Sequence, residues 1–143
     1  MTTPLTLDEY QKRAKETAVY PSIVADVLRP IRNKLPPGFL DKFEGELTQR
    51  GFACNPYYIA LGLAGEVGEI CEKLKKCLRD HDGDFTDEAV REAVKKELGD
   101  ALWYWSQLCE EFGFDAGAVA QANLDKLTSR KDRGVLKGEG DNR

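Results

Sequence analysis

The chain has 143 residues, of which 41% are hydrophobic and 32% are charged, a balance typical of one globular domain with a real core. Its formal net charge of -4 argues against a nucleic-acid binder, which needs a basic surface. No apolar run reaches the roughly 18 residues of a membrane span, and we expect no signal peptide and no membrane contact. The four cysteines form no CxxC pair, which favours reduced thiols and a cytoplasmic protein.

The first predicted element is a helix near the start of the chain. Thr6 and Glu9 have capping-box spacing, and the helix should run to about Val19, where a proline soon follows. Residues 22–54 are predicted to be a helical excursion. Pro30 and a later Pro-Pro-Gly break allow it two short helices at most.

Two long helices with a turn between them are predicted next. Asn55, followed by proline at the first helical position, caps a helix that runs to about Asp80. A turn rich in aspartate and glycine follows. Thr86 is predicted to cap the second helix, which ends near Gly113.

The last predicted helix completes an all-α chain. Asp115 opens this helix, which runs to about Lys131. The glycine-rich residues 134–143 are expected to form a flexible tail. Because no segment has the pattern of a strand, we predict one helical domain over residues 1–133, packed like a four-helix bundle.

Two acidic pairs lie on apolar stripes of the two long helices. Glu66 and Glu69 are three residues apart, as are Glu97 and Asp100, so each pair points to one side of its helix. Gly83, in the predicted turn, is equally distant from Glu66 and Asp100, and also from Glu69 and Glu97. In an antiparallel hairpin the two pairs should therefore face each other, about 15 residues or roughly 22 Å from the turn.

Four facing carboxylates cannot all remain bare anions in a partly apolar place. Either like charges raise several of their pKa values, or a cation lies among them. Oxygen ligands without a nearby histidine predict a hard cation, Mg²⁺ or alternatively Mn²⁺. Since Mg²⁺ held by carboxylates commonly completes its shell with water and phosphate, the cluster points to phosphate chemistry.

Three glycines surround the first acidic pair. Gly62, Gly65 and Gly68 each cost the helix about 1 kcal/mol relative to alanine, which indicates close approach of backbone or ligand. By contrast, Glu72 is interpreted as a solvated partner of Lys76, one helical turn away.

At these residues the chain resembles a known family. The segments GLAGEVGEICEKLKK and KKELGDALWYW resemble the ExxE and ExxD signature of the MazG-like all-α nucleoside triphosphate pyrophosphohydrolases. The resemblance extends to YQKRAKETAVYP, NLDKLTSRKDRG and GEGDNR. It implies a MazG fold and a house-cleaning reaction in which a nucleoside triphosphate, ribo or deoxy, gives the monophosphate and pyrophosphate.

The resemblance also implies roles for the acidic residues. Glu66, Glu69, Glu97 and Asp100 would be the Mg²⁺ ligands. Glu66 or Glu69 would in addition orient or deprotonate the attacking water, and the sequence does not separate these two roles.

Seven further residues are candidates for substrate binding. They are Lys73, Lys76, Arg79, Tyr104, Asn123, Lys126 and Arg130. The first three continue along or near the acidic side of their helix and could hold a polyphosphate, although a solvated helix end is the alternative for Arg79. Tyr104 could bond a phosphate or be a core tyrosine. The last three share one helix face and resemble the stretch that closes over substrate, with a plain surface face as the alternative.

Several alternatives stay open at this stage. A phosphoribosyl-ATP pyrophosphohydrolase and a non-catalytic helical assembly module are the competing functions. Trp103 and Trp105 are about 200° apart on the helix, so one could stack on a base while the other packs elsewhere. Apolar residues around much of the hairpin, together with the family resemblance, predict a homodimer or homotetramer.

Overall fold

The structure is a computed structural model that describes residues 4–21, 28–49 and 55–137. All of its regular elements are helices, which confirms the all-α prediction for the described residues. They are α1 (Leu7–Ala14), the 3-10 helices η1 (Lys15–Thr17) and η3 (Arg29–Lys34), α2 (Phe39–Gln49), α3 (Pro56–Asp80), α4 (Glu88–Glu111) and α5 (Ala116–Asp132). None of the described helices is long and apolar enough to cross a membrane.

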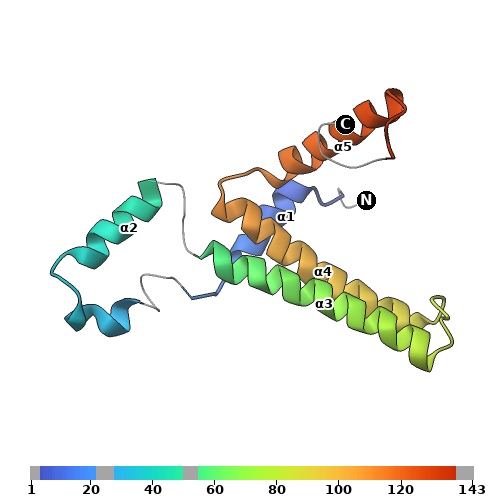
Figure 1. Cartoon of the computed structure of the whole chain (residues 1–143), viewed down its shortest axis with the longest axis horizontal. Helices are drawn as coiled ribbons and strands as arrows, with labels where there is room; N and C mark the ends of the chain where they lie inside the picture. Colours follow the sequence, from blue (N-terminus) through green and yellow to red (C-terminus); the bar gives the residue numbers. More distant parts are fainter. Residues whose placement is uncertain (1–3, 22–27, 50–54, 138–143) are drawn as a thin grey trace.

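The α3–α4 hairpin is the longest part of the molecule (Figure 1). The Asn55 side chain accepts a hydrogen bond from the Tyr58 N–H at 3.1 Å, which confirms the predicted cap of α3. Gly83 lies in the turn with a φ of 73°, a left-handed conformation that favours glycine. The predicted hairpin therefore forms about the predicted glycine.

The start of α4 differs from the prediction by one residue. Asp87, and not Thr86, is the N-cap, and its carboxylate accepts from the N–H groups of Ala89 and Val90 at 2.8 and 3.2 Å. The Thr86 hydroxyl donates to Asp84 at 2.6 Å instead. Because Asp84 already engages this hydroxyl in the turn, the next residue with a side-chain acceptor takes over the cap.

Helix α1 lies against α4 and anchors the start of α5. Its capping box forms as predicted, but α1 ends at Ala14 and continues only as the short η1, before the predicted end at Val19. The buried Gln11 side chain accepts from the Ala116 N–H at 2.8 Å and donates to the Phe114 carbonyl at 2.9 Å. These bonds fix the position of the α4–α5 turn.

The two ends of the excursion are held together at the end of α4. The buried Glu111 carboxylate accepts from the Tyr20 hydroxyl at 2.6 Å and from the Asn55 N–H at 2.9 Å. The Asn55 side chain also donates to the Pro21 carbonyl at 3.1 Å. The described part of the excursion holds η3 and α2, and α2 projects away from the hairpin (Figure 1). Residues 22–27 and 50–54 of the predicted excursion, and 138–143 of the predicted tail, lie outside the described residues.

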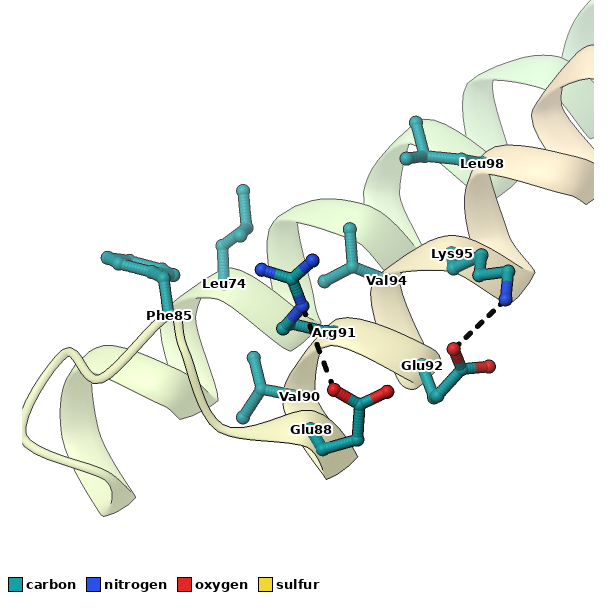
Figure 2. Close-up of a pocket in the computed structure, with 9 residues that line it drawn as sticks. All are labelled: Leu74, Phe85, Glu88, Val90, Arg91, Glu92, Val94, Lys95 and Leu98. Carbon is teal, nitrogen blue, oxygen red and sulfur yellow. Dashed lines mark hydrogen bonds and ion pairs between the residues drawn. The ribbon is translucent and has the colours of Figure 1, made fainter.

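One side of the hairpin is apolar and open to solvent, and we call it the apolar face. It consists of Val67, Leu74 and Leu78 of α3, Phe85 of the turn and Leu98 of α4, all exposed. Figure 2 shows that Leu74, Phe85 and Leu98 point to the same side, where they line a shallow depression of about 400 Å³.

The described cysteines agree with the prediction of reduced thiols. Cys71, Cys77 and Cys109 are all free, and the last two are buried. Burial is the main cause that raises the pKa of the Cys77 and Cys109 thiols, so both are packing residues. Cys54 lies outside the described residues.

Candidate active site

Three of the four predicted carboxylates meet between α3 and α4. One oxygen atom each of Glu66, Glu97 and Asp100 lies within 4.8 Å of the others. Glu66 and Asp100 are the pair equidistant from Gly83, so the structure confirms the register that the sequence predicts. Glu66 and Glu97 are half-buried, whereas Asp100 is exposed and leaves the group open on one side.

Glu69 lies at the rim of this group. Its side chain is 58% exposed, and its Oε2 atom is 3.9 Å from Lys73 Nζ. No carboxylate oxygen of Glu69 belongs to the three-carboxylate group of the described residues. Glu69 is still close enough for its charge to act on Glu66. We refer to the four carboxylates together as the acidic face.

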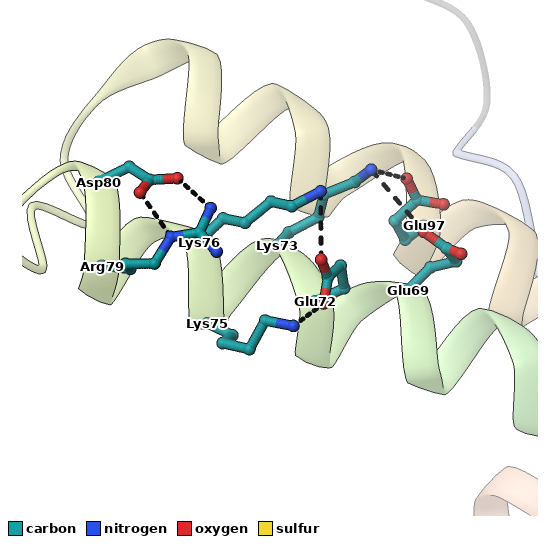
Figure 3. Close-up of polar contacts among 8 residues, drawn as sticks. All are labelled: Glu69, Glu72, Lys73, Lys75, Lys76, Arg79, Asp80 and Glu97. Atoms are coloured by element: carbon teal, nitrogen blue, oxygen red, sulfur yellow. Dashed lines mark hydrogen bonds and ion pairs between the residues drawn. The ribbon is translucent and has the colours of Figure 1, made fainter.

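Lys73 supplies a positive charge to the acidic face. Its Nζ atom is 3.2 Å from Glu97 Oε1 and 3.9 Å from Glu69 Oε2, so it links the two helices (Figure 3). The prediction that Lys73 lies on the acidic side is therefore confirmed. Its ammonium group has three N–H donors and could bind a phosphate oxygen in place of a carboxylate.

Burial and repulsion both act on Glu66. Burial is the main cause that raises the pKa of Glu66, and the negative charges of Asp100, Glu97 and Glu69 raise it further. A proton is therefore held more tightly at Glu66 than at an ordinary glutamate. A bound cation would remove the same repulsion, so protons and cations compete for this group.

The donor set fits a magnesium ion. All three groups are carboxylates, the ligands that Mg²⁺ prefers, and they lie on one open side where water or phosphate could complete the shell. The three oxygens lie within 4.8 Å of one another, and a Mg²⁺ ion bound by all three at about 2.1 Å would draw them closer together.

Tyr104 lies beside the acidic face, with its ring against the α3 backbone at Gly62. The close approach predicted from the glycines is therefore confirmed at Gly62. A Cβ atom at Gly65 or Gly68 would meet nothing within 4 Å among the described residues. At these two positions the contacts of the chain give no reason for glycine.

Two tyrosines that sequence reasoning missed also approach the site. Burial raises the pKa of Tyr10 on α1, and the charge of Asp100 adds to this effect, so Tyr10 lies near that carboxylate. Burial is the main cause that raises the pKa of Tyr104, and the neighbouring Tyr58 adds to this effect. Tyr58 lies two turns before Glu66, a spacing that could have identified it, whereas no local signal identifies Tyr10.

Lys76 and Arg79 are engaged away from the acidic face. Lys76 Nζ is 3.2 Å from Glu72 Oε1, which confirms the predicted pair, and Lys75 also contacts Glu72. Arg79 binds the carboxylate of Asp80 with two hydrogen bonds of 2.6 and 2.7 Å (Figure 3). Their roles in substrate binding remain predictions.

The candidates on α5 lie apart from the three carboxylates. Asn123 and Lys126 line an open depression with Trp105, and no residue of the acidic face lines it. Arg130 is buried in the last turn of α5. Trp103 points elsewhere, since its indole N–H donates to the Thr17 hydroxyl at 2.8 Å. The two tryptophans thus have separate surroundings, as their spacing predicts.

Comparison with known proteins finds similarity to a protein family and to a phage protein. The family model described as the MazG nucleotide pyrophosphohydrolase domain matches residues 55–135, which include α3, α4 and α5. A protein of Mycobacterium phage L5, named Gene 37 protein, is 42% identical over 137 residues, which make up 96% of this chain and 98% of that protein. No solved structure matches the chain.

Proposed function

Because the chain belongs to the MazG nucleotide pyrophosphohydrolase family, we propose that it is a Mg²⁺-dependent nucleoside triphosphate pyrophosphohydrolase. In this reaction a ribo- or deoxynucleoside triphosphate and water give the monophosphate and pyrophosphate. Removal of unwanted nucleotides from the cellular pool is the purpose that this chemistry would serve. The observation that carries the proposal is the group of Glu66, Glu97 and Asp100 with Lys73 beside it.

Glu66, Glu97 and Asp100 would hold the metal ion, and Mn²⁺ could replace Mg²⁺. A bound ion would polarise a phosphoryl oxygen and lower the pKa of a coordinated water. Burial first, and then the repulsion by the neighbouring carboxylates, raises the pKa of Glu66, and such an ion would relieve the repulsion.

Glu69 and Lys73 would act on the water and the polyphosphate. Glu69 lies outside the group of three and is exposed, so its carboxylate is available to orient a water molecule and accept its proton. The water oxygen forms a bond to phosphorus as the anhydride bond between the α- and β-phosphates breaks. Lys73 would then hold a phosphate oxygen in place of a carboxylate and balance the charge of the leaving pyrophosphate.

Product analysis tests this proposal. Purified protein is incubated with common and deoxynucleoside triphosphates, with and without Mg²⁺, and the products are separated by ion exchange. Monophosphate and pyrophosphate that form only with the metal support the proposal. Release of orthophosphate, or no turnover of any nucleotide, contradicts it. Activity on phosphoribosyl-ATP alone would select the other pyrophosphohydrolase.

We also infer that the chain works as a homodimer or homotetramer. The apolar face runs along the hairpin and stays exposed, and a second copy would bury it against an identical face. Since the same two helices carry the acidic face, a shared interface would also stiffen the site.

A further inference from the structure

A small depression lies between α3 and α4 on the turn side of the acidic face, and we call it the turn-side depression. Its volume is about 170 Å³, and Lys73, Lys76 and His81 line it from α3 and the residue that caps α3. From α4 it is lined by short side chains, among them Ala93, one turn before Glu97. Because Lys73 also contacts Glu97, the turn-side depression adjoins the acidic face.

The turn-side depression has the charge of an anion site. Two lysines and a histidine line it, and no aspartate or glutamate of the described residues does. The rest of its lining is uncharged and includes Ala89 and the buried Cys77. Walls of low polarity strengthen the attraction between a cation and a nearby anion. An anion that binds here would therefore meet the lysines without repulsion from a carboxylate in the lining.

The opposite end of the acidic face has a different character. Tyr104 lies one turn after Asp100, away from the hairpin turn, with its ring against Gly62. Trp103 contacts this ring edge to face, with ring centroids 5.0 Å apart and planes at 89°. Cations therefore follow the acidic face toward the hairpin turn, and aromatic rings follow it in the other direction.

We propose that the turn-side depression binds the β- and γ-phosphates of the nucleotide, with Lys76 as the cation that follows Lys73, so that the triphosphate points toward the hairpin turn. This inference rests on the proposed function for the identity of the ligand. The Lys76 side chain is 48% exposed, and its Nζ atom is 3.2 Å from Glu72 Oε1. An exposed ion pair of this kind contributes little free energy, so Lys76 can leave Glu72 and donate to a phosphate oxygen.

Lys75 is a matched control for Lys76. Both lysines pair with Glu72, but Lys76 approaches it from the side of α4 and Lys75 from the side away from α4 (Figure 3). Of the two, only Lys76 lines the turn-side depression. A substitution that acts through Glu72 or through net charge alone would therefore have the same effect at both positions.

Binding of inorganic pyrophosphate tests the proposal without turnover. Isothermal titration calorimetry with Mg²⁺ present measures its Kd for the wild type, Lys76→Gln and Lys75→Gln. Lys76→Gln should raise the Kd roughly tenfold, the loss typical of one hydrogen bond to a charged group, whereas Lys75→Gln should change it by less than about twofold. Equal Kd values for the two variants, or a wild type that does not bind pyrophosphate, would overturn the proposal.

Kinetics with nucleoside triphosphates separates this proposal from the proposed function. In an active enzyme, Lys76→Gln should lower kcat/KM roughly tenfold and Lys75→Gln should leave it nearly unchanged. If the wild-type protein hydrolyses no nucleotide, the proposed function is wrong, and the pyrophosphate Kd values still decide whether Lys76 binds phosphate. If the enzyme is active but the two lysine variants behave alike, the turn-side depression does not hold the terminal phosphates.

Discussion

Glu69 and Val67 are only two residues apart on α3, yet they belong to opposite sides of the hairpin, about 160° apart around the helix axis. Asp100 and Leu98 are related in the same way on α4. The acidic face lies on one side of the helix pair and the apolar face on the other. Both faces carry groups whose placement is unfavourable in free energy. The acidic face holds anions close together, and the apolar face exposes aliphatic side chains to water.

The two faces differ in whether other residues of the chain offset this unfavourable free energy. On the acidic face, Lys73 contacts Glu97 and Glu69, and Glu66 holds its proton more tightly than usual. On the apolar face, Leu78 and Leu98 remain 63% and 55% exposed, and no element of the described chain covers them. The acidic face is thus partly neutralised by the chain itself, whereas the apolar face needs a partner.

The largest expected effect comes from removing a carboxylate of the acidic face. Glu97→Gln and Glu69→Gln should lower turnover by about 100-fold or more, since even supporting groups around a metal commonly cost ten- to a hundredfold. Their melting temperatures without metal should be unchanged or higher, because one anion of the cluster is gone. Steady-state assays and thermal melts check this. Glu72→Gln is the control and should stay active, because Glu72 forms ion pairs with Lys75 and Lys76. An inactive control would mean that the acidic face is wrongly assigned.

The next effect tests the apolar face. Leu98→Glu should dissociate the homodimer, since it would place a negative charge among the aliphatic side chains of the apolar face. Light scattering at micromolar concentration should give at least twice the chain mass of 16.0 kDa for the wild type, and about that mass for the variant. Leu61→Glu is the control, because Leu61 is 74% exposed on α3 but lies off the apolar face. A fully active wild-type monomer would refute the interface.

Metal binding should stabilise the fold by a smaller amount. Mg²⁺ at about 100 times its Kd adds roughly 2.7 kcal/mol to the free energy of unfolding. Thermal melts with and without Mg²⁺ should therefore differ clearly in the wild type and hardly at all in Glu97→Gln. An unchanged wild-type melt would favour a non-catalytic helical module.

The smallest effect concerns pH. Because the folded-state pKa of Glu66 is raised above its usual 4.5, its stabilising contribution is fully present below that pH and is lost as pH rises through the raised value. Metal-free Glu66→Gln should therefore gain stability over the wild type in urea melts at neutral pH but not at pH 4. Glu72→Gln should instead lose stability relative to the wild type at neutral pH. Hydrogen bonds from Lys75 and then Lys76 lower the pKa of Glu72, so it stabilises above pH 4.5 and loses this effect as pH falls. A Glu66→Gln variant no more stable than the wild type at pH 7 would contradict the assigned repulsion.

The sequence by itself determined the helices and the core of the site. The capping box of Thr6, the cap at Asn55 and the turn at Gly83 all depend on residues within about four positions of one another. The spacing of Glu66 and Asp100 about Gly83 then sets which residues of two adjoining helices lie opposite each other. Local hydrogen bonding and helical periodicity act alike in any tertiary context, so the sequence pattern was sufficient to predict these features.

Only the tertiary structure decided which side chains surround that core. Tyr10 approaches Asp100, and Tyr20 reaches Glu111, across some ninety residues of chain. Glu69 stays exposed at the rim, whereas Lys73 reaches across to Glu97 on the opposite helix. The ring of Tyr104 packs against α3 because the pairing of α3 with α4 brings it next to Gly62. Such contacts depend on how distant segments close upon one another, and that closure has no local pattern in the sequence.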